Sequence, residues 1–142
     1  MSPELPSDVH EKIRLLSAEG DALAREKNYD GAIRKYQEAW ALLPEPKHQW
    51  EAARWLLAAI GDAHLFSGRF DKSLEAFTSA IVDAGGLGNP FLHLRRCESL
   101  FELGRTKEAA DELMRAYMGA GPKIFESEDP KYLAYLKTVA KL

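Results

Sequence analysis

One spacing pattern occurs three times in this chain and limits what the chain can fold into. A small residue is followed twelve positions later by a second small residue, four positions later by a large apolar residue, and three positions later by alanine. The three series are Gly20, Ala32, Tyr36 and Ala39; Gly61, Ser73, Phe77 and Ala80; and Cys97, Ala109, Leu113 and Ala116. Gaps of four and three place side chains on one face of a helix. The chain therefore contains three copies of one helical unit.

A turn divides each unit into two helices. The turn segments are "KNYDGA", "GRFDKS" and "GRTKEA", and each ends on the second small residue of its series. A glycine inside a helix, such as Gly61, costs about 1 kcal/mol relative to alanine, so close packing of the paired helices must compensate. Small residues allow that approach, and Tyr36, Phe77 or Leu113 would fill the space beside it. Three unrelated amphipathic hairpins are the alternative, and the recurrence of the whole pattern argues against them.

This pattern resembles that of the tetratricopeptide repeat family. The resemblance rests on "EGDALAREKNYDGAIRKYQEAWALLP", "IGDAHLFSGRFDKSLEAFTSAI" and "CESLFELGRTKEAADELMRAY", and it spans about Leu16 to Tyr117. The chain departs from the family pattern where Ser73 replaces alanine, Cys97 replaces glycine and Leu113 replaces an aromatic residue. The resemblance implies an all-α fold, with three tandem helix-turn-helix pairs in a right-handed superhelical α-solenoid. We expect one domain over residues 1–142, with repeats at about 13–46, 47–87 and 88–122.

Capping signals place the ends of the first and last helices. Ser7 or Asp8 is a suitable N-cap for a first helix that runs to about Glu26. Asp129 followed by proline is a good cap and first-turn pair, and the apolar residues after it predict a capping helix at about 129–141. Such a helix covers the last open face of a stacked-repeat protein. The expected total is seven helices and no strands.

The second repeat is longer than the family pattern requires. Gly20 and Gly61 are 41 residues apart, whereas the family period is about 34 residues. The roughly seven extra residues correspond to about two helical turns. We therefore expect Lys47 to Ala53 to extend the first helix of the second repeat at its N-terminus. One stripe of that helix would then hold Trp50, Leu57, Ile60 and His64.

Composition and charge argue against several classes of protein. The chain has 142 residues, a net charge of −3 and 29% charged residues, and a nucleic-acid binder would carry a basic footprint instead. The longest apolar run, "WLLAAI", is far shorter than the roughly 20 residues of a membrane span. The polar N-terminus shows no secretory signal, and a single cysteine forms no internal disulfide. We therefore expect a cytoplasmic protein whose partner is neither nucleic acid nor membrane.

No pattern in the sequence points to catalysis or to a metal site. No two histidines have the i, i+4 spacing of a zinc-binding helix; the four are His10, His48, His64 and His93. The Gly-rich segment "GGLGNP" lacks the strand, lysine and hydroxyl residue of a phosphate loop. Cys97 occupies a small-residue position, which predicts a buried packing thiol. We expect a protein that is not an enzyme and that uses no cofactor or metal.

The family resemblance also implies where a partner binds. In tetratricopeptide proteins the first helix of each pair lines a concave surface, and the residue after each leading small residue faces it, which here selects Asp21, Asp62 and Glu98. Aromatic anchors carry much of the energy of interfaces and complementary charge sets partner choice, so another protein, of basic character, is the expected partner. The predicted partner-binding residues are Asp21, Arg25, Trp55, Asp62, Phe66, Phe91, Arg95, Glu98, Phe101 and Glu102. The alternative is that the three acids are only solvated surface residues and that Trp55 packs against the first repeat.

Two functions fit such a surface. The small acidic three-repeat form, with its long second pair and the segment "GNPFLHLR", is similar to bacterial tetratricopeptide proteins encoded beside secreted toxins, which implies an immunity protein that neutralises a toxin domain. The alternative is an adaptor, or an assembly or secretion chaperone, that binds an extended peptide in the concave groove. A co-chaperone that holds a C-terminal carboxylate is not expected, because the acidic residues in the groove positions would repel that group.

Overall fold

The computed structural model describes residues 4–141, and over this range the chain is helical with no strand. Seven α-helices and two short 3-10 turns follow in the order α1 (Ser7–Arg25), α2 (Tyr29–Ala41), η1 (Lys47–Gln49), α3 (Glu51–Phe66), α4 (Phe70–Val82), α5 (Pro90–Glu102), α6 (Thr106–Ala120), η2 (Pro122–Phe125) and α7 (Pro130–Val139). The all-α expectation with seven helices is confirmed for this part of the chain. None of these helices combines the length and apolar character needed to cross a bilayer.

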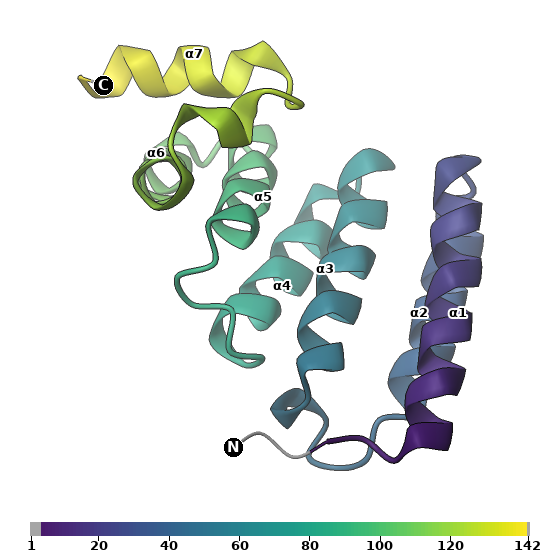
Figure 1. Ribbon diagram of the computed structural model, residues 1–142. Helices are drawn as coiled ribbons and strands as arrows, with labels where there is room; N and C mark the ends of the chain where they lie inside the picture. Colours follow the sequence, from purple (N-terminus) through teal and green to yellow (C-terminus); the bar gives the residue numbers. More distant parts are fainter. Residues whose placement is uncertain (1–3, 142) are drawn as a thin grey trace.

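The helices are arranged as three consecutive pairs. α1 packs most extensively against α2, α3 against α4, and α5 against α6, while α2 also contacts α3 and α4 contacts α5. Figure 1 shows the pairs following one another across the molecule, with α7 lying across the end of the last pair. The buried side chains form three hydrophobic clusters, one from α1 to the start of α3, one around α4, and one among α5, α6 and α7. Each pair is therefore buried by its neighbours rather than by a distant part of the chain.

The spacing pattern marks the tightest contact within a pair. A Cβ atom placed on Gly61 would lie 2.7 Å from Cζ of Phe77, and one on Gly20 would lie 2.5 Å from Cε1 of Tyr36. The groups that crowd the two glycines are therefore aromatic rings of the partner helix, which refines the expectation of direct backbone approach. In the third pair Cys97 faces a smaller neighbour, Leu113, and both are fully buried. Because Leu113 is smaller than the aromatic ring at the same position of the other pairs, it leaves space for the side chain of Cys97.

The start of α3 differs from the expectation. Lys47–Gln49 forms a 3-10 turn and Trp50 is extended, so the helix begins at Glu51 and only part of the predicted N-terminal extension is helical. Side chains tie this turn to the end of α2: the Trp50 indole N–H donates to the carbonyl of Pro44 (2.8 Å), and Lys47 Nζ donates to the carbonyl of Leu43 (2.7 Å). Trp50 is consequently outside the helical stripe that we expected it to share.

The two ends of the helical array agree with the sequence to different degrees. α1 ends at Arg25, close to the expected position, but its N-cap is Pro6, and no side chain caps it. The Ser7 or Asp8 cap is therefore a wrong prediction. At the other end the Asp129 carboxylate accepts a hydrogen bond from the backbone N–H of Lys131 (3.0 Å), and proline occupies the first helical turn, as predicted. α7 then covers the third pair with buried residues Tyr132 and Leu136.

Candidate protein-binding face

Helix α3 lines hollows on two opposite sides of its axis. Residues spaced like Trp55, Asp62 and Phe66 point one way, whereas Leu57 and His64 point about half a turn away from them. The first group faces α1 and α5. Asp62 and Phe66 line one hollow together with Asp21 of α1, and Asp62 forms an ion pair with Arg95 of α5. We call the surface formed by the accessible predicted residues the first-helix face, and it consists of Asp21, Arg25, Trp55, Asp62, Phe66, Phe91 and Arg95.

A hollow of about 410 Å³ opens on this face between α1 and α3. Four predicted residues line it, namely Asp21, Arg25, Asp62 and Phe66. The hydroxyl of Tyr36 donates to Asp21 Oδ1 at 2.6 Å, and burial together with this contact raises the pKa of Tyr36. The Asp21 carboxylate is therefore held in place by the same tyrosine that packs against Gly20.

Arg95 is the centre of the polar contacts on this face. Its Nη1 donates to Glu98 Oε1 (2.8 Å) and to Glu128, and its Nε lies 2.9 Å from Asp62 Oδ1. The last contact is an ion pair without an aligned hydrogen bond, because Asp62 Oδ1 and Arg95 Nε both lack a hydrogen-bond partner among residues 4–141. The Arg95 guanidinium also lies over the ring of Phe66 (5.1 Å to the centroid). One basic side chain thus offsets much of the acidic character expected here.

Glu98 does not line an open surface. It is only 2% exposed, because the segment before α7 places Glu128 against the same arginine. Phe101 and Glu102 are also engaged within the chain: the ring of Phe101 packs edge-on against Tyr132 (5.5 Å between centroids), and the Tyr132 hydroxyl donates to Glu102 (2.9 Å). The expected line of three accessible acids is therefore corrected to two, Asp21 and Asp62, since the capping segment fills the third position.

Burial controls the protonation of the acids around Arg95. Desolvation raises the pKa of Asp62 to about 6, although the nearby Arg95 acts in the opposite direction. Desolvation and a hydrogen bond with Glu128 raise the pKa of Glu98 to about 8. At pH 7 Asp62 is consequently mostly ionised and Glu98 mostly protonated. The protonated Glu98 explains how two buried glutamates can share one guanidinium without strong repulsion.

Trp55 lies at the other end of the first-helix face. It lines a hollow of about 870 Å³ together with Leu5, the η1 turn and residues 83–85. Seven residues separate Trp55 from Asp62, which corresponds to about 10 Å along the helix axis. The two hollows therefore lie along the same side of α3, one near each end. Trp55 is 37% exposed and is not part of the buried cluster that α3 forms with the first repeat.

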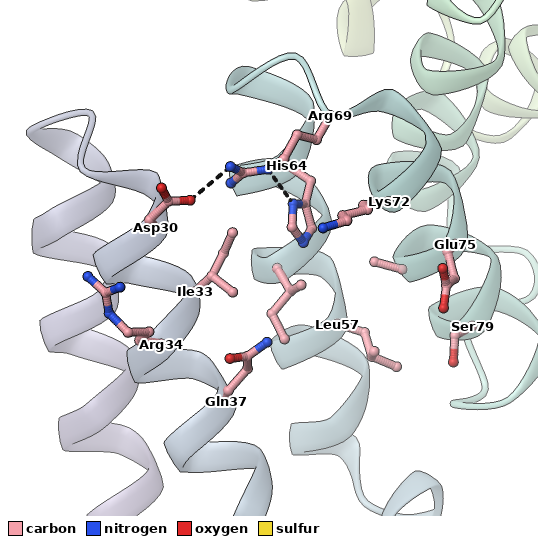
Figure 2. A pocket seen from close by; sticks show the side chains of 12 residues that line it. Asp30, Ile33, Arg34, Gln37, Leu57, His64, Arg69, Lys72, Glu75 and Ser79 are labelled. Atoms are coloured by element: carbon pink, nitrogen blue, oxygen red, sulfur yellow. Dashed lines mark hydrogen bonds and ion pairs between the residues drawn. The ribbon is translucent and has the colours of Figure 1, made fainter.

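A third hollow, of about 610 Å³, lies between α2 and α4 on the opposite side of α3. Figure 2 shows Arg69 placed between Asp30 and His64 in this groove. Arg69 pairs with Asp30 (2.8 Å) and its Nε donates to His64 Nδ1 (3.0 Å). Burial, followed by the charges of Arg69 and Lys72, lowers the pKa of His64. These contacts join the first two repeats, so the groove already has a structural role.

His93 and Cys97 are both buried within the third helix pair. His93 contacts Glu112 between α5 and α6 and accepts a hydrogen bond from the backbone N–H of Gly88 (3.3 Å) at Nε2. Cys97 is fully buried, as predicted, and burial raises the pKa of its thiol. Residues 4–141 bring no three His, Cys, Asp or Glu side chains together in a way that could hold a metal ion.

The stacked pairs form a helical-repeat fold, and a protein-family model matches part of the chain. Residues 58–123, from within α3 to η2, match the family described as Tetratricopeptide repeat. A comparison with curated protein sequences gives no match. The matched segment, just under half of the chain, contains the second and third series of the spacing pattern.

Solved structures with a similar fold include a TPR domain from a plant and a secretion chaperone from a bacterium. The Arabidopsis OM64 TPR domain is 22% identical, with a TM-score of 0.70 over 91% of this chain and 94% of that chain. The Yersinia enterocolitica type III secretion translocator chaperone SycD is 15% identical, with a TM-score of 0.71 over 91% and 90% of the two chains. SycD in complex with a peptide of the translocator YopD is 18% identical, with a TM-score of 0.72 over 96% of each chain.

Proposed function

We propose that this chain is a protein-interaction module that binds an extended segment of a partner protein along the first-helix face. The observation that carries the proposal is the distribution of exposed aromatic rings. Among residues 4–141 the exposed tryptophan and phenylalanine side chains are Trp55 (37%), Phe66 (54%) and Phe91 (39%), and all three belong to this face. Exposed aromatic rings beside hollows are typical of binding surfaces.

The finer proposal is an adaptor or an assembly or secretion chaperone. SycD supports it, because a protein of the same fold and nearly the same length is a translocator chaperone seen with a peptide of its translocator. The two hollows at either end of α3 suit an extended segment, since Trp55 and Asp62 lie about 10 Å apart along the helix axis and a strand-like peptide covers that distance with about three residues. Because Glu98 is buried, only Asp21 and Asp62 on this face favour a basic partner.

An immunity protein for a basic toxin domain is the second candidate. The net charge of −3 favours it, and so does the sequence resemblance to small repeat proteins encoded beside toxins. Arg95 weakens this argument, because it neutralises part of the acidic surface. A folded domain would also contact a wide area, whereas the accessible aromatic residues follow a narrow path along α3 and α5.

Peptide display on the purified chain tests the proposed function. Peptides selected against the wild type should bind with micromolar affinity, and the double variant Trp55→Ala/Phe66→Ala should weaken them by at least about tenfold, as expected for two interface anchors. The matched control is Leu15→Ala/Val82→Ala, which removes exposed apolar side chains that line none of the three hollows. Equal losses in both variants would contradict binding along the first-helix face.

The same experiment separates the two finer functions. A chaperone or adaptor should bind the selected linear peptides with the stoichiometry of one peptide per chain. An immunity protein should instead form a complex with a folded toxin domain and select no linear peptide. A folded partner bound through the Trp55 and Phe66 positions, with no peptide selected, would replace the chaperone proposal by the inhibitor.

A further inference from the structure

The hollow between α1 and α3 has walls of an unusual composition. Phe66 and Tyr29 bring aromatic rings to it, with their centroids 6.5 Å apart, and Phe66 is the most exposed aromatic ring of the face. Asp21 and Asp62 bring carboxylates from the two helices that flank it. Aromatic faces attract cations, and carboxylates pair with them, so the walls combine two attractions for one positively charged group.

The molecule already binds a guanidinium with two of these four residues. Arg95 approaches from α5, lies over the ring of Phe66 at 5.1 Å and places its Nε 2.9 Å from Asp62. It reaches a second ring, Phe91, at 4.8 Å. An arginine between aromatic rings and carboxylates is therefore an arrangement that this surface stabilises. The hollow offers similar groups on the α1 side of Phe66.

Hydrogen-bonding capacity in the hollow is left over after the internal contacts are made. Asp62 Oδ1 is buried against Arg95 Nε (2.9 Å), but the Asp62 side chain as a whole is 29% exposed, so its accessible part lies elsewhere on the carboxylate. The Tyr36 hydroxyl binds Oδ1 of Asp21, and the ion pairs formed within residues 4–141 do not include that carboxylate. Arg25 lines the same hollow, so its positive charge opposes the entry of another cation.

We propose that the α1–α3 hollow binds the guanidinium of an arginine side chain presented by the partner segment. Arginine suits it better than lysine, because a planar guanidinium stacks on a ring and can donate to two carboxylates at the same time. As a description of partner choice this inference rests on the proposed function. The hollow itself is a small-molecule site that can be tested without the partner.

An NMR titration of the uniformly ¹⁵N-labelled chain with N-acetylarginine amide tests the site. We expect saturable shifts of backbone amides in residues 21–29 and 59–66, and no saturable shift with N-acetylcitrulline amide, the neutral analogue of the same shape. Asp21→Asn should weaken binding about two- to fivefold, the loss of one partly exposed charge pair. Because asparagine can still accept from the Tyr36 hydroxyl, this variant keeps the internal hydrogen bond. Equal shifts with the arginine and citrulline amides would overturn the inference.

Two further variants should change the affinity for N-acetylarginine amide in the opposite direction or not at all. Arg25→Gln should tighten binding of N-acetylarginine amide, because it removes the competing positive charge. Glu75→Gln is the matched control, since it removes one negative charge from the groove between α2 and α4 and should leave the affinity unchanged. An affinity lowered equally by Glu75→Gln and Asp21→Asn would show a general charge effect and contradict a defined site.

The inference and the proposed function can fail separately. Display-selected peptides that depend on Trp55 and Phe66 but ignore Asp21→Asn and Arg25→Gln would refute the arginine site and leave the first-helix face as the binding surface. The converse result, specific binding of N-acetylarginine amide without any peptide bound along the face, would support the hollow and refute the peptide-binding proposal.

Discussion

The contact between Gly61 and Phe77 yields the sharpest prediction about stability. A Cβ atom added at Gly61 would lie 2.7, 2.8 and 3.0 Å from three atoms of the Phe77 ring, and Phe77 is fully buried. Helix propensity alone makes Gly61→Ala stabilising by about 1 kcal/mol. Overpacking of a core costs about 1–3 kcal/mol, and a ring without free space places the cost in the upper part of that range. We therefore expect a net loss of about 1–2 kcal/mol.

Urea denaturation followed by circular dichroism measures this loss, and thermal melting should show a shift of about 2–4 °C for each kcal/mol. The informative control is the same substitution in a Phe77→Leu background, where the ring is absent and alanine should be neutral or stabilising. A double-mutant cycle then isolates the steric coupling. If Gly61→Ala stabilises the wild type as much as it stabilises the Phe77→Leu variant, the ring does not press on the glycine and the explanation of the repeat spacing is wrong.

Three other predictions concern the third pair and the C-terminal helix. Because the pKa of Glu98 rises from 4.5 to about 8 on folding, the folded state holds this proton more tightly, so its stabilisation is lost as pH rises from about 5 to 8. The free energy of unfolding of Glu98→Gln relative to wild type should therefore increase over that range in urea titrations, and a constant difference would contradict the buried, protonated Glu98. Cys97, whose thiol is fully buried with a raised pKa, should react with a thiol reagent only at the unfolding rate; immediate reaction would contradict its burial. Asp129→Ala removes the N-cap of α7 and should cost about 1 kcal/mol in urea titrations, while no loss would mean that α7 contributes little to the stability of the domain.

The contacts inside each helix pair could be predicted from the sequence because they are local and periodic. Gly61 and Phe77 are sixteen positions apart, and the same separation recurs in the other two pairs. Spacing of this kind reports the geometry of two helices joined by a short turn, so it also predicted the burial of Cys97. The number of helices followed from the same pattern and from the cap and proline at Asp129.

The sequence could not predict in the same way which of the candidate site residues are buried by the rest of the chain. Glu128 is 33 positions from Arg95 and occurs once, so no repeat marks the contact that buries Glu98. The start of α3 is a similar case, because the hydrogen bond from Trp50 to Pro44 depends on how the turn folds back on α2. A clue was present at Arg95, a basic residue one turn before Glu98, since i, i+3 pairs of opposite charge commonly interact.

Paramagnetic relaxation on the ¹⁵N-labelled chain, with a spin label attached to a display-selected peptide, tests the proposed binding surface most directly. The first-helix face predicts line broadening of backbone amides at residues 21–25, 55–66 and 91–95, in α1, α3 and α5. Broadening centred instead on residues 33–37 and 72–79, which flank the groove of Figure 2, would show that the partner binds between α2 and α4 and would contradict the account.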